Sequence, residues 1–580
     1  MYTLGINAAF HDPAACLVAD GHVVAASEEE RFTRIKHGKR PVPFSTWELP
    51  FHAIDACLAA ADIALRDVDH VAYSFQPAQL LGARASARTI AIPLNPARYP
   101  VPGNGENAWD PLFLAHIANA PRQLADGAPL HLARRFKGVC WDGPHRWHFV
   151  DHHEAHAASA YLASPFDDAA VLCLDGRGET ATTTYWHGRD AEVELIGHVD
   201  LPHSLGLLYE EVTDHLGFLR SSDEYKVMAL ASYGEPRYAP ELRGMIRVKG
   251  GGTYTIQPSR LVDRFGPARE RGGPLEQAHL DLARSLQLVL EETVVELARW
   301  LRDASGARAL CMAGGVALNC VMNARLRAAA IFDHVWVQPA SGDAGTALGA
   351  ALAVDARARG AATHEGMPHA YLGPSYDDAE IERFLRWSRL PYRREADVAD
   401  RTAQLLSENR IVGWFQGAME FGPRALGARS ILASPIDPAM QGRLNDLKDR
   451  EDFRPVAPVV IEEEAGNWFE NAGEAPFMLF TFGVRADRAD RIPAVRHVDG
   501  TARVQTIRRA QNERYYDLLR AFERRTGVPV LVNTSFNTRG EPIVCTPRDA
   551  LESFWTSPLD ALAIGSFLVE KPATADGAEP

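Results

Sequence analysis

Residues 169–190 read AAVLCLDGRGETATTTYWHGRD: an apolar strand, a short polar turn, a second strand and a Gly turn. The same order opens the chain at residues 3–21, TLGINAAFHDPAACLVADG, where Asp20-Gly21 is typical of a tight hairpin turn. Two copies of one strand-turn-strand unit predict a duplicated α/β domain, although unrelated hairpins can also look alike. In a duplicated domain the turns at 7–12 and 175–179 would face each other across a cleft.

The size and charge of the chain limit the classes of function. Its 580 residues are too many for one hydrophobic core, so we expect at least two domains. The net charge of −14 argues against broad binding of nucleic acid or an anionic membrane, and any anionic ligand needs a local basic cluster. Seven cysteines without a C-x-x-C pair, no evident signal peptide and no long apolar run indicate a cytoplasmic protein.

Composition and periodicity divide the chain into segments. We expect a first α/β domain over 1–360, with an insertion near 76–145 that is rich in Pro, Gly and Arg and could wall an acceptor pocket. A linker is predicted at 361–375, a second domain at 376–572 and a disordered tail at 573–580.

A histidine-rich stretch follows the insertion, VDHHEAHAASAY at 150–161. If Asp151 caps a helix, His152 and His156 lie four positions apart on one face, where two imidazoles can reach one metal ion. Asp343 in SGDAG and Asp175 in LDGRGE are the best carboxylate partners, because each lies at a strand-to-turn junction of the predicted cleft. The alternative is a solvated helix start that merely tolerates histidine.

Two further turns pair small residues with a following helix, in ALCMAGGVALNC and QPASGDAG. Such turns present free backbone N–H groups at a helix N-terminus, where a nucleotide can approach, although glycines also occur there for packing. The candidate nucleotide-binding residues are Gly314, Gly315, Asn319 and Gly342.

The second domain holds a local basic cluster around FGPRALGARS. Guanidinium groups bind phosphate through two parallel hydrogen bonds and Lys adds a point charge, so the cluster predicts capture of ATP or a phosphorylated donor. Solvated surface arginines are the alternative. The candidate residues are Arg424, Arg429, Lys448, Arg503, Ser535 and Asn537.

Several long stretches together resemble one family. They are GINAAFHDPAACLVADG, EERFTRIKHG, DHHEAHAASAYLASPF, GGVALNC, FGPRALGARSILASP and LVNTSFN, and they occur in this order over nearly the whole chain. By its resemblance in these stretches, the chain is identified as a member of the NodU/CmcH O-carbamoyltransferase family, which includes antibiotic-tailoring enzymes.

The resemblance implies both fold and reaction. It implies an N-terminal duplicated domain of the actin/Hsp70/sugar-kinase (ASKHA) class, similar to the tRNA threonylcarbamoyl transferase, followed by an α/β YrdC-like domain. The YrdC-like domain would convert carbamoyl phosphate and ATP to carbamoyl-adenylate at the six residues of the basic cluster. The N-terminal domain would bind the adenylate at the glycine turns and pass the carbamoyl group to a hydroxyl of a small natural product.

The resemblance also implies the roles of the N-terminal residues. His152, His156 and Asp343 match the metal ligands, with Fe(II) as the implied metal and Mn, Zn or Mg as alternatives. The expected catalytic residues are His37, His11 and Asp175. His37 is the favoured general base, because the motif RxKH contains it, and His11 is the other candidate.

Two other functions stay open at this stage. One is a threonylcarbamoyl-type transferase acting on tRNA, which the acidic charge disfavours, and the other is a non-catalytic Hsp70-like module that binds metal and nucleotide. We expect a small-molecule hydroxyl acceptor, no nucleic-acid or membrane partner, and either a monomer or a homodimer.

Overall fold

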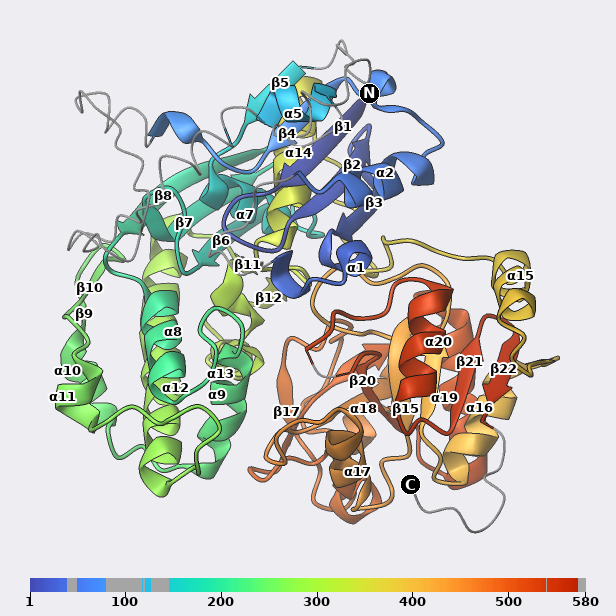
Figure 1. The fold of residues 1–580 in the computed structure, drawn as a ribbon. Coiled ribbons are helices and arrows are strands. Elements are labelled where there is room, and N and C mark those ends of the chain that lie inside the picture. The colour runs from blue at the N-terminus through green and yellow to red at the C-terminus, as the bar shows by residue number, and fades with distance from the viewer. Residues whose placement is uncertain (39–48, 80–116, 118–119, 127–145, 539, 572–580) are drawn as a thin grey trace. The chain divides into compact units, whose positions relative to one another are not determined.

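The structure is a computed structural model that describes residues 1–38, 49–79, 117, 120–126, 146–538 and 540–571. Most of the expected insertion near 76–145 and all of the expected tail at 573–580 lie outside the described residues. The chain divides into two compact units, one ending at Met367 and the other beginning at Pro368 (Figure 1). No described helix is long and apolar enough to cross a membrane.

Two five-stranded sheets form the frame of the first unit. Their strand orders are β3-β2-β1-β4-β5 and β8-β7-β6-β11-β12, so the same topology occurs twice. In each sheet the three strands that come first in the chain pair antiparallel with one another. They are β1, β2 and β3 in one sheet and β6, β7 and β8 in the other. The two later strands, β4 and β5 or β11 and β12, then add in parallel beside β1 or β6. This repetition confirms the predicted duplicated α/β domain. The strands are β1 Tyr2–Asn7, β2 Ala14–Ala19, β3 His22–Glu28, β4 His70–Tyr73, β5 Arg146–Phe149, β6 Asp168–Leu174, β7 Ala181–Arg189, β8 Glu192–Asp200, β11 Ala309–Ala313 and β12 His334–Val337.

Helices α7 (His152–Tyr161) and α14 (Ala344–Arg359) pack directly against each other and α14 also packs on β1 (Figure 1). The predicted cap of α7 is confirmed, because Asp151 Oδ1 accepts a hydrogen bond from Glu154 N at 2.9 Å. Alanine is the commonest residue of both helices and α14 also contains glycine, which lets their backbones approach closely.

This close approach predicts a large stability loss for Gly349→Ala. A Cβ at Gly349 would lie 1.7 Å from Ala155 O and 2.7 Å from Ser159 N, so α7 and α14 would have to move apart. We expect a loss of about 2–3 kcal/mol, measured by urea unfolding. The control is Gly244→Ala in α10 (Ala239–Met245), where no atom lies within 4 Å of the added Cβ. Equal stability of both variants would contradict the predicted tight contact.

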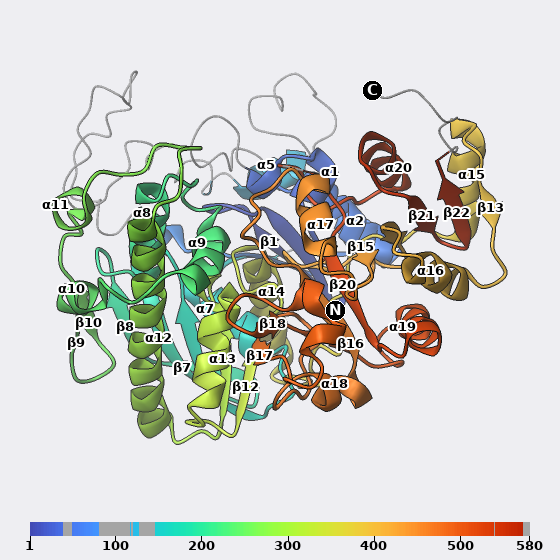
Figure 2. The same cartoon turned by 90° about the horizontal axis from the view of Figure 1, so that it is seen from below.

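The long helix α12 runs over Gln277–Ser305. It packs beside α8 (Leu205–His215), α9 (Glu224–Leu230) and α13 (Cys320–Ala328), as Figure 2 shows. Six cysteines of the described residues are buried and free.

The second unit is built on an eight-stranded mixed sheet of order β13-β22-β21-β14-β15-β20-β16-β19. This sheet and its helices agree with the predicted α/β class of the second domain. The strands are β13 Arg393–Arg394, β14 Val412–Phe415, β15 Arg429–Ala433, β16 Ala457–Ile461, β19 Gln505–Ile507, β20 Val530–Ser535, β21 Ala561–Ile564 and β22 Phe567–Glu570. The helices are α15 Asp378–Ser388, α16 Val398–Ser407, α17 Met440–Leu447, α18 Glu462–Trp468, α19 Glu513–Thr526 and α20 Pro547–Thr556.

Candidate metal centre and basic cluster

Four buried side chains of the first unit point at one spot. His152 and His156 come from the first turns of α7, Asp175 follows β6, and Asp343 precedes α14. His152 Nε2 lies 3.6 Å from both Asp175 Oδ2 and Asp343 Oδ1. His156 Nε2 lies 3.9 Å and 3.7 Å from the same two oxygens. The sequence offered Asp175 both as a carboxylate partner of the metal and as a catalytic residue, and the structure places it with His152, His156 and Asp343.

The geometry of this His-Asp cluster fits a divalent metal ion. Its four ligand atoms all lie within 4.8 Å of one another. Within the described part of the chain, His152 Nε2, His156 Nε2 and Asp343 Oδ1 are buried without a hydrogen-bond partner. An ion bonded at about 2.0–2.2 Å to nitrogen and oxygen holds its ligand atoms roughly 3–4 Å apart. The three orphaned atoms and the spacing are therefore those of a metal site.

Hydrogen bonds with neighbouring groups orient the candidate metal ligands. His152 Nδ1 lies 3.3 Å from Ser74 O and, as an N–H donor to it, leaves the Nε2 lone pair for a metal. Asp175 Oδ1 accepts a hydrogen bond from Gly315 N at 2.8 Å, so its other oxygen turns toward the cluster. Glu179, from the same turn as Asp175, accepts the backbone N–H of His152 at 3.1 Å and fixes the start of α7.

The charged groups of the cluster shift one another's pKa values in the absence of a metal. Burial alone would lower the pKa of His152, but the carboxylates of Asp343 and Asp175 raise that pKa well above its usual value. Burial would raise the pKa of Asp343, but His11 and His152 lower it to about 2. The metal-free cluster therefore favours the protonated form of His152.

This proton predicts a pH-dependent affinity for metal. A bound ion needs neutral His152, and the raised pKa means that this proton must leave on binding. We expect the Kd for Mn²⁺, measured by calorimetry, to fall about tenfold per pH unit between about pH 6 and 8. A Kd that stays constant over this range would contradict the protonated metal-free state.

A pair of histidines borders the cluster. Asp12 bridges them, with Oδ2 at 3.0 Å from His11 Nδ1 and Oδ1 at 2.8 Å from His37 Nδ1. His11 Nε2 lies 3.7 Å from Asp343 Oδ2, which connects the pair to the His-Asp cluster. His37 Nε2 has no hydrogen-bond partner among the described residues. Sequence reasoning missed Asp12, although an acidic residue directly after His11 was a usable signal.

The glycine turns lie beside the same cluster. Gly315 N is the donor to Asp175, and a Cβ at Gly314 would lie 2.2 Å from Leu174 O, so this turn requires glycine. Asn319 Oδ1 caps α13 by accepting from Met322 N at 3.0 Å, and its side-chain amide also pairs with that of Gln287. This gives Asn319 a structural role.

Gly342 directly precedes the N-cap Asp343 of α14. Binding of an adenylate at the four turn residues stays a prediction.

In the second unit the structure brings three predicted residues together. Lys448 is buried at the end of α17, and its Nζ donates to Asn537 Oδ1 at 2.7 Å and to Ser535 Oγ and O at 3.0 and 2.5 Å. These three acceptors are uncharged oxygens that fix the position of the ammonium group. The resulting Lys448 cluster suits an anionic ligand.

The arginines of the predicted basic cluster differ in their surroundings. Arg424 and Arg503 are half-buried, the latter at the end of β18 (Thr501–Arg503). Arg429 is fully buried over the Phe415 ring, and its two Nη atoms donate to four backbone carbonyls. No terminal N–H of Arg429 is left for a phosphate, which corrects the sequence-based assignment to phosphate binding. The Nη groups of Arg429 donate instead to backbone carbonyls, including that of Pro374, which is distant in the sequence.

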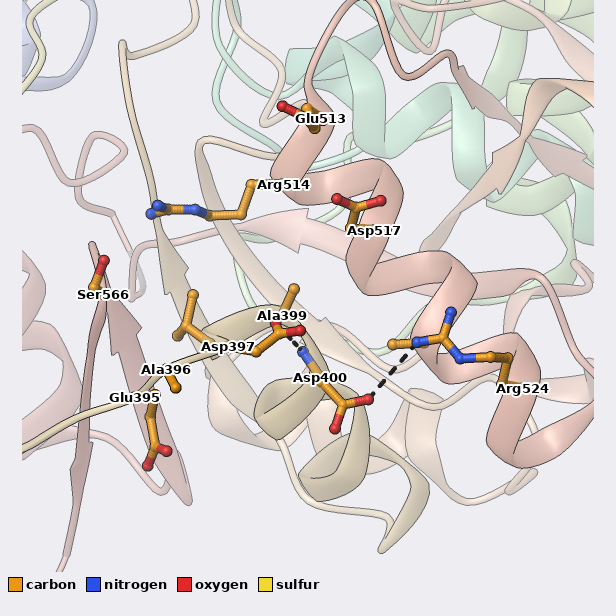
Figure 3. Close-up of a pocket in the computed structure, with 12 residues that line it drawn as sticks. Glu395, Ala396, Asp397, Ala399, Asp400, Glu513, Arg514, Asp517, Arg524 and Ser566 are labelled. Atoms are coloured by element: carbon orange, nitrogen blue, oxygen red, sulfur yellow. Dashed lines mark hydrogen bonds and ion pairs between the residues drawn. The ribbon is translucent and has the colours of Figure 1, made fainter.

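A separate pocket of about 360 Å³ lies beside the N-terminal end of α16 and along α19. Figure 3 shows its acidic side chains and the pair of Arg524 with Asp400, which are 3.8 Å apart. None of the predicted basic-cluster residues lines it. The pocket is therefore not the predicted phosphate site.

Comparison with known proteins agrees with this division of the chain. The family description "Carbamoyltransferase N-terminus" matches residues 2–352, and "Carbamoyltransferase C-terminus" matches residues 403–571. The Synechocystis protein named "Uncharacterized protein sll1178" is 39% identical, over 99% of this chain and 97% of its own length.

Nodulation protein NolNO of Sinorhizobium fredii is 39% identical, over 97% of this chain and 80% of its own length. The crystal structure of T. kodakarensis HypF is 15% identical, with a TM-score of 0.32 over 63% of this chain and 49% of that one. The matches to both halves and the full-length relatives show that this chain belongs to the carbamoyltransferase family.

Proposed function

We propose that this carbamoyltransferase is ATP-dependent and transfers a carbamoyl group from carbamoyl phosphate to a hydroxyl of a small natural product, such as a sugar or an antibiotic scaffold. The observation that carries the proposal is the buried His-Asp cluster bordered by the Asp12-bound His37. A metal-ligand set next to a carboxylate-oriented imidazole is a combination that acyl-type transfer to an alcohol uses.

The second unit would make the activated donor. Hydrolysis of carbamoyl phosphate gives carbamate and phosphate, and attack of carbamate on the α-phosphorus of ATP gives carbamoyl-adenylate and pyrophosphate. All these species are anions, and the ammonium group of Lys448, which Ser535 and Asn537 hold in place, offers them a positive charge. Arg424 and Arg503 complete the proposed site, together with Ser535 and Asn537.

The first unit would carry out the transfer. His37 Nδ1 is held by Asp12, so Nε2 can take the proton of the acceptor hydroxyl while its oxygen bonds to the carbamoyl carbon. The bond from that carbon to the adenylate oxygen breaks, and AMP leaves. The glycine turns would bind the adenylate. A divalent ion held by His152, His156, Asp175 and Asp343 would supply Lewis-acid chemistry, polarising the carbamoyl carbonyl.

We propose Fe(II) as the resident metal, with Mn, Zn or Mg as alternatives. Two imidazoles and two carboxylates suit a first-row divalent ion better than Mg, which prefers oxygen ligands. Elemental analysis of protein purified without oxygen identifies the ion.

The test of the proposed function is a product assay. The protein is incubated with ATP, ¹⁴C-labelled carbamoyl phosphate and a panel of hydroxylated sugars and antibiotic precursors. We expect AMP and a labelled carbamate ester, and neither without carbamoyl phosphate. ATP consumption that does not depend on carbamoyl phosphate would contradict the proposal and favour a nucleotide-binding module of another kind.

A further inference from the structure

A buried ion-pair network lies immediately before His37. It is formed by Glu28 at the end of β3 and by Glu30 and Arg31 of the short helix α1 (Glu30–Thr33). Arg31 Nε lies 2.7 Å from Glu28 Oε2, and Arg31 Nη1 lies 2.9 Å from Glu30 Oε1. The Arg31 side chain is 3% exposed, so these pairs are shielded from water. The network holds one oxygen of Glu30 in a fixed place.

The other oxygen of Glu30 binds the backbone of His37. His37 N donates to Glu30 Oε2 at 2.6 Å, a short bond to a charged acceptor. His37 has a φ of 59°, in the left-handed region that few residues other than glycine adopt, although Asn, Asp and His do so more often than the rest. The carboxylate therefore stabilises a backbone conformation that would otherwise be unfavourable.

The same residues could be taken for a second metal site. Ligand atoms of Asp12, Glu30 and His37 lie within 4.8 Å of one another. Unlike those of the His-Asp cluster, their carboxylate oxygens already accept hydrogen bonds or ion pairs from N–H donors: His11 and His37 for Asp12, Arg31 and His37 for Glu30. This arrangement is a saturated hydrogen-bond network, in which His37 Nε2 is the one ligand atom without a partner among the described residues.

We propose that Glu30 is a positioning residue for His37. Two anchors define the direction of the imidazole: Asp12 holds Nδ1 of the ring, and Glu30 holds the backbone from which the ring projects. With both anchors in place, Nε2 has one orientation toward an acceptor hydroxyl. This inference rests on the proposed role of His37 as general base, and it adds that the base is held by the charged network of α1.

The chemistry of Glu30→Gln makes the proposal testable. A glutamine has one acceptor oxygen and one donor nitrogen, whereas Glu30 accepts from two donors, Arg31 and His37. One of these contacts must become a clash between two N–H groups. Glu30→Asp keeps the charge beside Arg31 but is one methylene too short to reach His37 N as well. Both variants should release His37 while leaving Asp12 in place.

The experiment measures the two half-reactions separately in the full-length protein. Glu30→Gln and Glu30→Asp are expected to lower kcat for carbamoyl transfer from supplied carbamoyl-adenylate about 10- to 100-fold. The KM for ATP and for carbamoyl phosphate, and the rate of adenylate formation, should not change. The control is Glu29→Gln, because Glu29 bonds His52 and Ala53 N instead of His37. It is expected to transfer at the wild-type rate.

A double variant separates positioning from general stability. If Glu30 acts through His37, Glu30→Gln in a His37→Ala background should lower transfer no further, whereas a structural role predicts multiplied losses. Multiplied losses, or wild-type transfer by both Glu30 variants, overturn the proposal. Wild-type transfer by His37→Ala alone would overturn the base assignment instead, so the two failures are distinguishable. Metal content and circular dichroism identify a misfolded Glu30→Gln, in which case Glu30→Asp decides.

Discussion

The His152→Ala/His156→Ala double variant is expected to hold no divalent ion and to lose carbamoyl transfer by at least about 10³-fold. Both Nε2 atoms are buried and orphaned among the described residues, and they face Asp175 and Asp343 at 3.6–3.9 Å. Removing them leaves two carboxylates at a site that no longer has nitrogen ligands. Transfer should fail because the carbamoyl carbonyl is then no longer polarised.

The matched control is His153→Ala, on the same helix. His153 is also buried, but its Nδ1 contacts Thr184 Oγ1 at 3.1 Å and it is not part of the His-Asp cluster. We expect this variant to keep roughly one ion per chain, even though the cavity left by the smaller side chain lowers its stability. Elemental analysis and the transfer assay are run on both proteins. Full metal occupancy in the double variant would show that the ion lies elsewhere.

The sequence predicted the fold and most of this cluster because both depend on local pattern. The repeated strand-turn-strand units at 3–21 and 169–190 became sheets with the same strand order. The spacing of His152 and His156 depends on a single helix. Asp343 and Asp175 could be proposed from their positions in turns that follow predicted strands. Each of these signals is contained within about one secondary-structure element.

The residues that sequence analysis misjudged depend on contacts between distant segments. The position of Asp12 directly after His11 is visible in the sequence. Its hydrogen bond to His37, however, depends on the path of the chain through α1 and a left-handed turn. Arg429 lies in a loop of small residues that looked exposed. Its burial follows from carbonyls at Pro374 and Gly417 and from the ring of Phe415, which no local pattern reveals.

The proposed division of labour makes a second, opposite prediction for Lys448→Ala. Lys448 belongs to the second unit, and the His-Asp cluster belongs to the first. The variant should lose formation of carbamoyl-adenylate, because the ammonium charge opposite the phosphate groups is gone, with a cost of about 2–4 kcal/mol in transition-state stabilisation. It should still transfer the carbamoyl group from chemically supplied carbamoyl-adenylate.

Measurement of both half-reactions in both proteins decides the question. Adenylate formation is followed by exchange of labelled pyrophosphate into ATP, and transfer by the carbamate product. The control for Lys448→Ala is Lys448→Arg, which keeps the charge but not the compact geometry that fits Ser535 and Asn537. A partial loss is expected for it. If His152→Ala/His156→Ala abolishes pyrophosphate exchange while the protein stays folded, one site performs both steps. If Lys448→Ala exchanges pyrophosphate at the wild-type rate, the Lys448 cluster does not bind the donor, and the anions of the first step must be held by other side chains.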